Sequence, residues 1–262
     1  MTEDWQQNTA LIHAKDISKT FTSAKGDQVI SLENISLDIF RNEFVSIVGP
    51  SGCGKSTLLK IIGGLLSPTS GSVEIDGAVV KGAVGNIGFV FQSATLFPWR
   101  TVEDNILLPI DVKHLNRAEY SQRAGDLIKF AGLGGFETKF PFELSGGMQQ
   151  RVSIVRALIH NPKIILMDEP FGALDAITRE QMGLELLRIW QAQRITTVFV
   201  THDIAEAIFL SDRVFTMSPR PGKIIRAINI QLPRPREPAM MMEKQFLDYQ
   251  MEIKSELNLL KN

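Results

Sequence analysis

Residues 44–62 have the sequence Phe-Val-Ser-Ile-Val-Gly-Pro-Ser-Gly-Cys-Gly-Lys-Ser-Thr-Leu-Leu-Lys-Ile-Ile, and this stretch decides the fold class. Its first five residues form a nearly continuous apolar run, which is typical of a buried parallel strand. Glycine stops the run, and leucine and isoleucine then recur at helical spacing. The stretch therefore predicts a strand, a glycine-rich loop and a helix in direct succession.

Two further apolar runs, at residues 164–167 and 196–200, also end in polar residues. Asp168 and Glu169 follow the first run, and His202 follows the second after one threonine. Because ligands of parallel α/β sheets bind at the carboxyl ends of the strands, these polar residues are candidates for a functional site.

Helical patterns occupy residues 147–160, 177–193 and 204–210, so that strands and helices alternate along the chain. This order predicts a parallel sheet built from strand–helix–strand units. Residues 93–144 contain several helical patterns, including one at 117–131, and few β-branched runs. We interpret this region as a helical subdomain inserted into the α/β core.

Proline becomes frequent after Ser218, which predicts an extended linker. Apolar residues then recur every three or four positions from Phe246 to Leu260, which predicts a final helix. The expected organisation has three parts. They are an α/β core at residues 1–92 and 156–218, a helical subdomain at 93–155, and a linker and helix at 219–262.

Composition excludes several classes of protein. Of the 262 residues, 44% are hydrophobic and 22% charged, and the formal net charge of −1 gives no general attraction for nucleic acid. The single cysteine, Cys53, permits no disulfide within the chain, which suits a reducing compartment. Residues 1–8 lack the pattern of a secretory signal, and we expect no membrane-spanning helix because no apolar run reaches about 18 residues.

The glycine-rich loop matches the phosphate-binding pattern G-x-x-x-x-G-K-[S/T]. The matching residues are Gly49, Pro50, Ser51, Gly52, Cys53, Gly54, Lys55 and Ser56. Glycines let successive backbone N–H groups face phosphates, Lys55 supplies a cation, and Ser56 is the expected magnesium ligand. Cys53 is either a small tolerated residue or a nucleophile. We favour the first role because the backbone does the binding.

Asp168 and Glu169 are suited to the second half of a phosphate-transfer site. Asp168 would orient magnesium-bound water, and Glu169 would polarise the attacking water. The alternative is an acidic loop that serves solubility alone. The presence of Lys55 upstream favours the catalytic interpretation.

A second glycine-containing turn, Ser145-Gly146-Gly147, precedes the helical pattern that begins at residue 147. It would form another anion-binding helix N-terminus. One chain has one triphosphate loop, so this extra site would be redundant unless it met ATP bound to another copy. The alternative, an ordinary helix cap, is nearly as well supported by the residues alone.

Residues 144–151 resemble the signature motif of ATP-binding-cassette (ABC) proteins, and the family's other motifs occur in the expected order over residues 11–217. These are the glycine loop 49–56, Gln92 as the Q-loop, Asp168-Glu169, the D-loop Ala173-Leu174-Asp175 and the switch histidine His202. The resemblance implies a P-loop NTPase (RecA-like) parallel-sheet core with an antiparallel β subdomain and an inserted α-helical subdomain. It also implies ATP and Mg²⁺ as cofactors.

Residue roles follow from the same resemblance. Lys55, Ser56 and Thr57 would hold phosphate and magnesium, and Lys55 and Gln92 would also belong to the catalytic group. Gln92 would sense both the magnesium and the attacking water, and Asp168 would complete the metal site. Glu169 would act as the catalytic base, and His202 would contact the γ-phosphate. Ser145, Gly146 and Gly147 would reach that phosphate from a second copy, so that two chains close head to tail over two ATP molecules. Without the resemblance, a histidine after a strand is more often a structural hydrogen-bonding group.

An aromatic residue near the start of the chain usually stacks on adenine in this family, and Phe21 occupies that position where tyrosine is common. Phenylalanine keeps the π-face that stacks on adenine and lacks the hydroxyl of tyrosine. The alternative is that Phe21 belongs to the core.

Among the subfamilies, the chain resembles the ATPases of nitrate, sulfonate and taurine importers. The resemblance rests on residues 96–99 (Leu-Phe-Pro-Trp), 168–175, 218–222 (Ser-Pro-Arg-Pro-Gly) and 232–236 (Leu-Pro-Arg-Pro-Arg). Only the two tail motifs favour this branch, and a disordered terminus has a similar composition. The apolar group Phe97-Pro98-Trp99 would dock a helix of a membrane partner, or would pack locally.

The resemblance implies a peripheral subunit at the cytoplasmic face of the inner membrane. Its expected partners are a second copy, transmembrane permease subunits and, indirectly, a substrate-binding protein, with no nucleic acid. The alternatives are a soluble ABC ATPase acting on ribosomes or DNA, a nucleotide switch without turnover, and an exporter half. One motif set, no sustained heptads and no basic excess disfavour the first of these.

Overall fold

The computed structural model describes residues 10–172 and 174–259 and divides into two compact units. Unit 1 comprises residues 1–85 and 194–262, and unit 2 comprises residues 86–193. These boundaries differ from the expected ones. The tail beyond residue 218 belongs to unit 1, and the strand that ends at Asp168 is grouped with the helices of unit 2.

One sheet of unit 1 is antiparallel and has the strand order β2-β1-β4-β5. Its strands are β1 (Ile12–Thr22), β2 (Gln28–Ile39), β4 (Ser70–Ile75) and β5 (Ala78–Val79). Ile12 of β1 lies opposite Ile39 of β2 and Ile75 of β4, so one register brings apolar residues of three strands together. This sheet is the antiparallel β subdomain that the sequence resemblance implies.

The other strands of unit 1 follow the order β10-β9-β3-β8. They are β3 (Phe44–Val48), β8 (Thr196–Thr201), β9 (Arg213–Met217) and β10 (Ile224–Asn229). Strand β3 pairs in parallel with both β8 and β9. Every residue of β3 and β8 is buried, which explains why their sequences are apolar runs without alternation. The strand predicted at residues 44–48 is confirmed.

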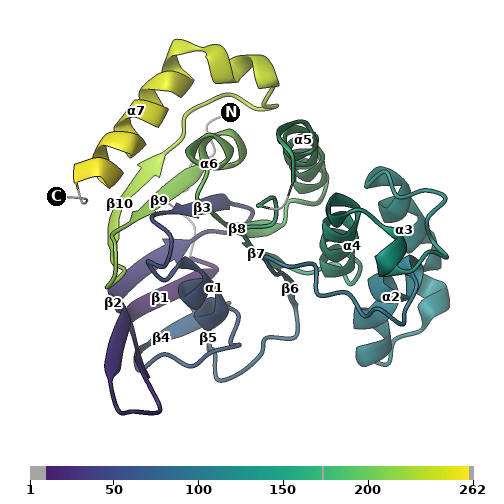
Figure 1. The fold of residues 1–262 in the computed structure, drawn as a ribbon, viewed down its shortest axis with the longest axis horizontal. Coiled ribbons are helices and arrows are strands. Elements are labelled where there is room, and N and C mark those ends of the chain that lie inside the picture. Colours follow the sequence, from purple (N-terminus) through teal and green to yellow (C-terminus); the bar gives the residue numbers. More distant parts are fainter. Residues whose placement is uncertain (1–9, 173, 260–262) are drawn as a thin grey trace. The chain divides into compact units, whose positions relative to one another are not determined.

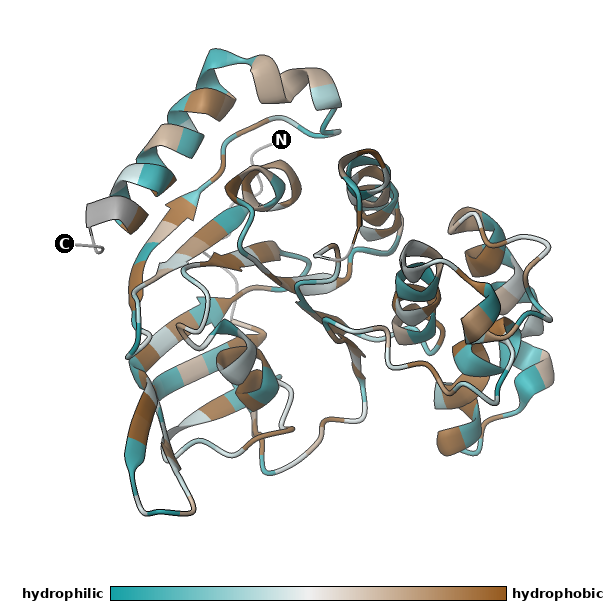
Figure 2. Ribbon diagram, viewed as in Figure 1, coloured by the Kyte–Doolittle hydropathy of each residue, from teal (hydrophilic) through white to brown (hydrophobic). Residues whose placement is uncertain are grey.

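Helices cover the parallel strands of unit 1 (Figure 1). Helix α1 (Lys55–Ile62) contacts β8 and β2, and α6 (Ile204–Leu210) packs on β3. Helix α7 (Lys244–Leu259) packs against α6 and β9 and is preceded by a short 3-10 turn, Pro238–Met242. Hydrophobic and hydrophilic residues alternate around the turns of these helices (Figure 2). The final helix predicted from its apolar spacing is confirmed, with Phe246 and Ile253 fully buried, and Leu260 lies outside the described residues.

The tail after Ser218 corrects one prediction. Residues 224–229 form β10, which pairs antiparallel with β9, where the proline density predicted an extended linker. The prolines lie on either side of this strand, at positions where no ladder hydrogen bond from a backbone N–H is needed.

Unit 2 combines the parallel strands β6 (Ile87–Val90) and β7 (Ile164–Asp168) with helices. The helices are α2 (Val102–Val112), α3 (Arg117–Phe130), α4 (Gly146–Leu158) and α5 (Ala176–Gln193), with a 3-10 turn at Pro141–Glu143. Thr101, Asn116 and Ser145 each accept a backbone hydrogen bond as N-caps of α2, α3 and α4. The helices expected near 117–131, 147–160 and 177–193 are present with ends shifted by at most two residues.

Two arginines of the tail hold the C-terminal end of α6. Arg236, only 4% exposed, donates to the carbonyl oxygens of Ile208 (2.9 Å) and Ser211 (3.1 Å). Arg234 donates to the carbonyl of Leu210 at 2.9 Å and pairs with Asp212 at 2.7 Å. A cation at a helix C-terminus satisfies the last carbonyls and complements the helix dipole. Burial, and the neighbouring Arg234, lower the pKa of Arg236 to about 10.

We expect Arg236→Ala to destabilise the protein by about 2–4 kcal/mol, because it leaves buried carbonyls without donors. The matched control is Arg226→Ala, which removes an exposed arginine paired with Glu252 and Glu256 of α7. An exposed pair is worth about 1 kcal/mol or less. Urea unfolding of both variants checks the difference. Equal unfolding midpoints would contradict a structural role for Arg236.

Candidate nucleotide site

The phosphate loop follows β3 and leads into α1, both within unit 1. Gly52 and Gly54 have φ of 75° and 108°, in the left-handed region that favours glycine. A Cβ on Gly54 would lie 2.5 Å from Cδ2 of Leu32, so β2 also leaves no room for a side chain there. Gly54 begins α1 without a side-chain cap. The first N–H groups of the helix therefore need partners outside it, which suits an anion.

Lys55 is 4% exposed, and its ammonium lies inside the loop. Nζ donates to the carbonyl oxygens of Gly49 at 2.9 Å and Pro50 at 3.1 Å. Ser56 and Thr57 are half-buried at the start of α1, and the Thr57 hydroxyl accepts from Ser31 of β2 at 3.4 Å. The loop thus combines helix N–H groups and a cation, as phosphate binding requires.

Cys53 is buried in this loop, and burial raises the pKa of its thiol. A nucleophilic cysteine needs a lowered pKa and some exposure. The environment therefore favours the interpretation of Cys53 as a small packing residue.

Two further expected residues lie in unit 1. Phe21, near the end of β1, is 43% exposed and lies opposite Val29 of β2, with the Lys19 ammonium 5.3 Å from its ring centroid. The exposed ring is available for stacking and is not a core residue. His202 is exposed just after β8, and Asp203 caps α6 by accepting from Ala205 at 2.8 Å. The buried strand and the capped helix fix the backbone on both sides of the histidine.

In unit 2, Asp168 ends β7 and is 5% exposed, and Glu169 follows it. Glu169 has φ of 45°, an uncommon backbone conformation for a residue with a side chain. Its carbonyl oxygen accepts from Gly172 N at 3.1 Å, which closes a turn. Strained backbone of this kind clusters at functional sites.

The signature segment begins α4. Ser145 is exposed, and its side chain accepts from Met148 N at 3.3 Å, so the helix-cap interpretation is confirmed. Capping and anion binding are compatible here, because Ser145 and Gly146 remain exposed at the helix start. A Cβ on Gly147 would lie 3.2 Å from Leu174.

The same helix holds the Q-loop segment. Gln150 of α4 donates to the carbonyl of Phe91 at 3.2 Å. Arg156, on the same helix, donates to the carbonyls of Ala94 at 2.8 Å and Thr95 at 3.0 Å. Gln92 lies between these anchors and is exposed. Sequence reasoning missed Arg156, since a basic residue in a helix gives no sign of its distant partners.

The D-loop leads into α5. Asp175 accepts from Thr178 N at 3.0 Å, and this bond lowers the pKa of its carboxyl. Leu174 is buried, and Ala173 lies outside the described residues.

The expected residues are divided between the two units. Unit 1 holds the phosphate loop, Phe21 and His202, and unit 2 holds Gln92, the signature segment, Asp168 and Glu169. Sequence reasoning also missed two contacts of the phosphate loop. Leu32 of β2 fills the space beside Gly54, and Arg220 of the segment 218–223 donates to the carbonyl of Gly52.

Several of the expected site residues carry oxygen donors of the kind that magnesium takes. Within residues 10–172 and 174–259, no three His, Cys, Asp or Glu side chains are grouped in a way that could hold a metal ion. Mg²⁺ commonly takes one or two protein oxygens, with phosphates and water as the other ligands. The Ser56 hydroxyl, the buried Asp168 carboxylate and the Gln92 amide oxygen are donors of that kind.

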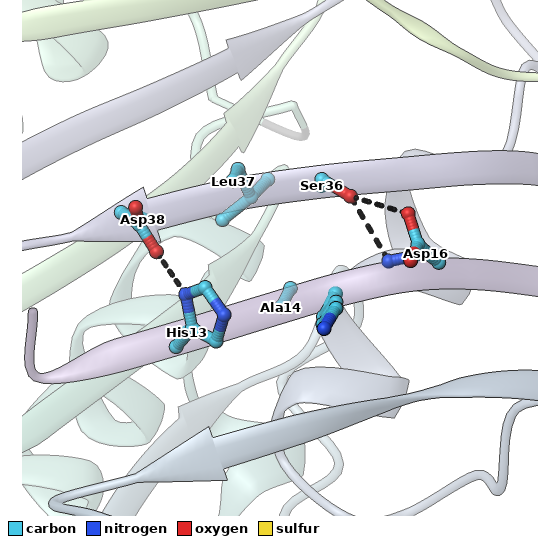
Figure 3. Close-up of a pocket in the computed structure, with 7 residues that line it drawn as sticks. His13, Ala14, Asp16, Ser36, Leu37 and Asp38 are labelled. Carbon is cyan, nitrogen blue, oxygen red and sulfur yellow. Dashed lines mark hydrogen bonds and ion pairs between the residues drawn. The ribbon is translucent and has the colours of Figure 1, made fainter.

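A separate pocket in unit 1 contains none of the expected site residues (Figure 3). It lies between β1 and β2, where His13 pairs with Asp38. Ser36 accepts from the backbone N of Asp16 at 2.9 Å and donates to its carboxylate at 3.1 Å. These polar groups bond one another across the strands, and we assign the pocket no ligand.

Comparison with known proteins identifies relatives over nearly the whole chain. An uncharacterized ABC transporter ATP-binding protein of Methanocaldococcus jannaschii is 47% identical over 96% of this chain and 91% of its own length. The aliphatic sulfonates import ATP-binding protein of Bacillus cereus is 45% identical over 86% of this chain and 88% of its own. Relatives named for nitrate import, bicarbonate transport and taurine import are 43%, 42% and 44% identical.

A solved structure also matches. The dimeric post-hydrolysis state of an ATP-binding cassette bound to ADP and Pi superposes with a TM-score of 0.76 at 37% identity, covering 85% of this chain and all of the other. The fold is accordingly that of a P-loop NTPase. A search of the described helices finds none with the length and apolar character needed to cross a membrane. The profile of the ABC transporter family matches residues 32–172, more than half of the chain, and the chain therefore belongs to the ABC transporter family.

Proposed function

We propose that this chain is the ATP-binding and ATP-hydrolysing subunit that energises an ABC importer. The observation that carries the proposal is the phosphate loop, with left-handed glycines around the buried ammonium of Lys55. Such a loop binds the phosphates of a nucleotide. The importer assignment is supported by relatives named for import of sulfonates, nitrate and taurine. We assign the solute to that class of small polar compounds. Other subunits would determine which compound is transported.

The proposed partners follow from this role. Two copies close head to tail over two ATP molecules, and transmembrane permease subunits receive the motion. A substrate-binding protein acts through the permease, and nucleic acid is not a partner. The chain then works as a peripheral protein at the cytoplasmic face of the inner membrane. The stacked Phe97 and Trp99, whose ring centroids are 5.0 Å apart, are our candidate for the permease contact, since Trp99 is 69% exposed.

Each residue has a proposed part in hydrolysis. Phe21 stacks on adenine, and the loop N–H groups with Lys55, Ser56 and Thr57 bind the phosphates. Ser56, Gln92 and Asp168 would hold Mg²⁺, which when bound neutralises phosphate charge. Glu169 accepts a proton from the attacking water. At the same time the water oxygen bonds to the γ-phosphorus, and the bond from that phosphorus to the leaving oxygen breaks.

The remaining residues recognise the γ-phosphate. His202 contacts it from the same copy, and Ser145 with Gly146 and Gly147 reaches it from the second copy. ATP binding would draw the two copies together, and hydrolysis would reopen the pair.

Lys55→Ala should weaken ATP binding by about 10- to 100-fold, because it removes the ammonium inside the loop and the hydrogen bonds that this ammonium donates to two loop carbonyls. Lys60→Ala is the matched control, since Lys60 lies on the exposed face of the same helix. Titration with a fluorescent ATP analogue measures both affinities. Equal affinities would refute the assigned phosphate site.

Glu169→Gln should retain ATP binding and lower the hydrolysis rate by at least about a hundredfold, since the amide cannot accept the proton. The ATP-bound dimer should then accumulate in size-exclusion chromatography with ATP present. Glu180→Gln, an exposed glutamate of α5, should hydrolyse ATP at the normal rate. Normal turnover by Glu169→Gln would exclude Glu169 as the base.

Affinity purification of the tagged chain from detergent-solubilised membranes of its host should recover a polytopic permease. Trp99→Glu should lose most of that permease, while Met251→Glu, which alters another exposed apolar residue, on α7, should retain it. Mass spectrometry identifies the recovered proteins. Recovery of ribosomal or DNA-repair proteins alone would overturn the importer assignment and leave the ATPase assignment standing.

A further inference from the structure

The carbonyl oxygens of a phosphate loop need partners away from the phosphates. Lys55 serves those of Gly49 and Pro50. The carbonyl of Gly52 accepts hydrogen bonds from Arg220, which is distant in the sequence. Nε and Nη2 of Arg220 donate to it at 3.2 Å and 3.0 Å. A bond from a charged donor is stronger than one between neutral groups. Arg220 is therefore a second cation attached to the loop.

Arg220 lies in the hairpin turn between β9 and β10, residues 218–223, which is itself fixed. Ser218 N donates to the carbonyl of Lys223 at 3.0 Å, and Lys223 N donates to the hydroxyl of Ser218 at 3.0 Å. Two hydrogen bonds of this kind close the base of the turn and limit the positions that Arg220 can take.

Gly222 of this turn anchors it to β2 and to the loop. Gly222 N donates to the carbonyl of Ser31 at 2.9 Å, and Glu33 N donates to the carbonyl of Gly222 at 3.0 Å. A Cβ on Gly222 would lie 2.1 Å from the carbonyl oxygen of Cys53. The turn and the phosphate loop are thus in backbone contact, at a distance that only glycine permits.

The bond to Arg220 holds the carbonyl side of a peptide group whose N–H takes part in a turn. Cys53 N donates to the carbonyl of Pro50 at 3.3 Å, so residues 50–53 form a β-turn with Gly52, at φ 75°, in its third position. Glycine permits several backbone conformations at little cost. Because the C=O and N–H of one peptide point in opposite directions, holding the Gly52 carbonyl toward Arg220 fixes the direction of the Cys53 N–H.

We propose that Arg220 is a positioning residue that holds the Gly52–Cys53 peptide in the orientation the phosphate loop needs, and so sets the affinity for the phosphates of ATP. This inference rests on the proposed function, in which the loop binds ATP. Arg220 acts through the backbone of the loop and does not take part in proton transfer. Its loss should therefore raise Kd and KM for ATP and leave kcat at saturating ATP nearly unchanged.

The test compares Arg220→Ala with Lys223→Ala, a variant of the same turn that loses the same charge. Lys223 pairs with Glu33 of β2 at 3.1 Å, and its side chain is 54% exposed. We expect Arg220→Ala to raise the Kd of a non-hydrolysable fluorescent ATP analogue with Mg²⁺ about tenfold, equivalent to about 1.4 kcal/mol. Lys223→Ala should stay within about twofold of the unaltered chain.

Arg220→Lys keeps a donor and a charge, and should recover part of the lost affinity. The thermal unfolding midpoint separates loop positioning from general damage: the inference holds if affinity falls while the midpoint changes little. It is overturned if Arg220→Ala binds normally, if Lys223→Ala reproduces the loss, or if affinity falls only in proportion to lost folded protein. Failure of the unaltered chain to bind the analogue would instead refute the proposed function itself.

Discussion

A phosphate loop can turn its N–H groups toward an anion only if its carbonyl oxygens find donors elsewhere. In this chain two of these donors are cations, the ammonium of Lys55 and the guanidinium of Arg220. Both bring positive charge to the site while they hold the backbone, so the same contacts shape the loop and favour a polyanion. Two strands of unit 1 support this arrangement. The buried strand β3 delivers the loop, and β2 closes the space behind Gly54.

In unit 2, helix α4 combines an exposed N-terminus with side chains that bond to backbone carbonyls. Its N-terminus stays exposed, with Ser145 supplying the cap, while its interior side chains hold the Q-loop segment through carbonyl oxygens. Gln150 and Arg156 therefore tie the Q-loop segment to the signature helix. In both units, long polar side chains bonded to carbonyls connect motifs that are distant in sequence.

Local patterns in the sequence were enough to predict the elements that bear the motifs. The apolar run at 44–48, the glycines after it and the helical spacing at 55–62 each fix one neighbouring element, and the structure has β3 and α1 with those bounds. The tail was misjudged because proline frequency is a local signal, whereas β10 depends on pairing with β9. The Arg220 contact spans 168 residues, and nothing near Arg220 identifies Gly52 as its partner. The Ser-Pro-Arg-Pro-Gly motif was visible in the sequence, but its purpose depends on tertiary contact.

The proposed cycle requires a ligand that distinguishes an open pair from a closed one. A nucleotide that bound only the phosphate loop would stabilise both states equally and could shift no equilibrium, however tightly it bound. If the exposed start of α4 contacts the γ-phosphate of ATP bound to the second copy, ATP stabilises the closed pair more than the open pair, because that contact exists in the closed pair alone. Hydrolysis then removes the distinguishing group and leaves the phosphate loop with ADP. In this scheme Lys55 and Arg220 provide affinity for ATP in both the open and the closed pair. Ser145, Gly146 and Gly147 make the affinity for ATP higher in the closed pair, and this difference drives closure.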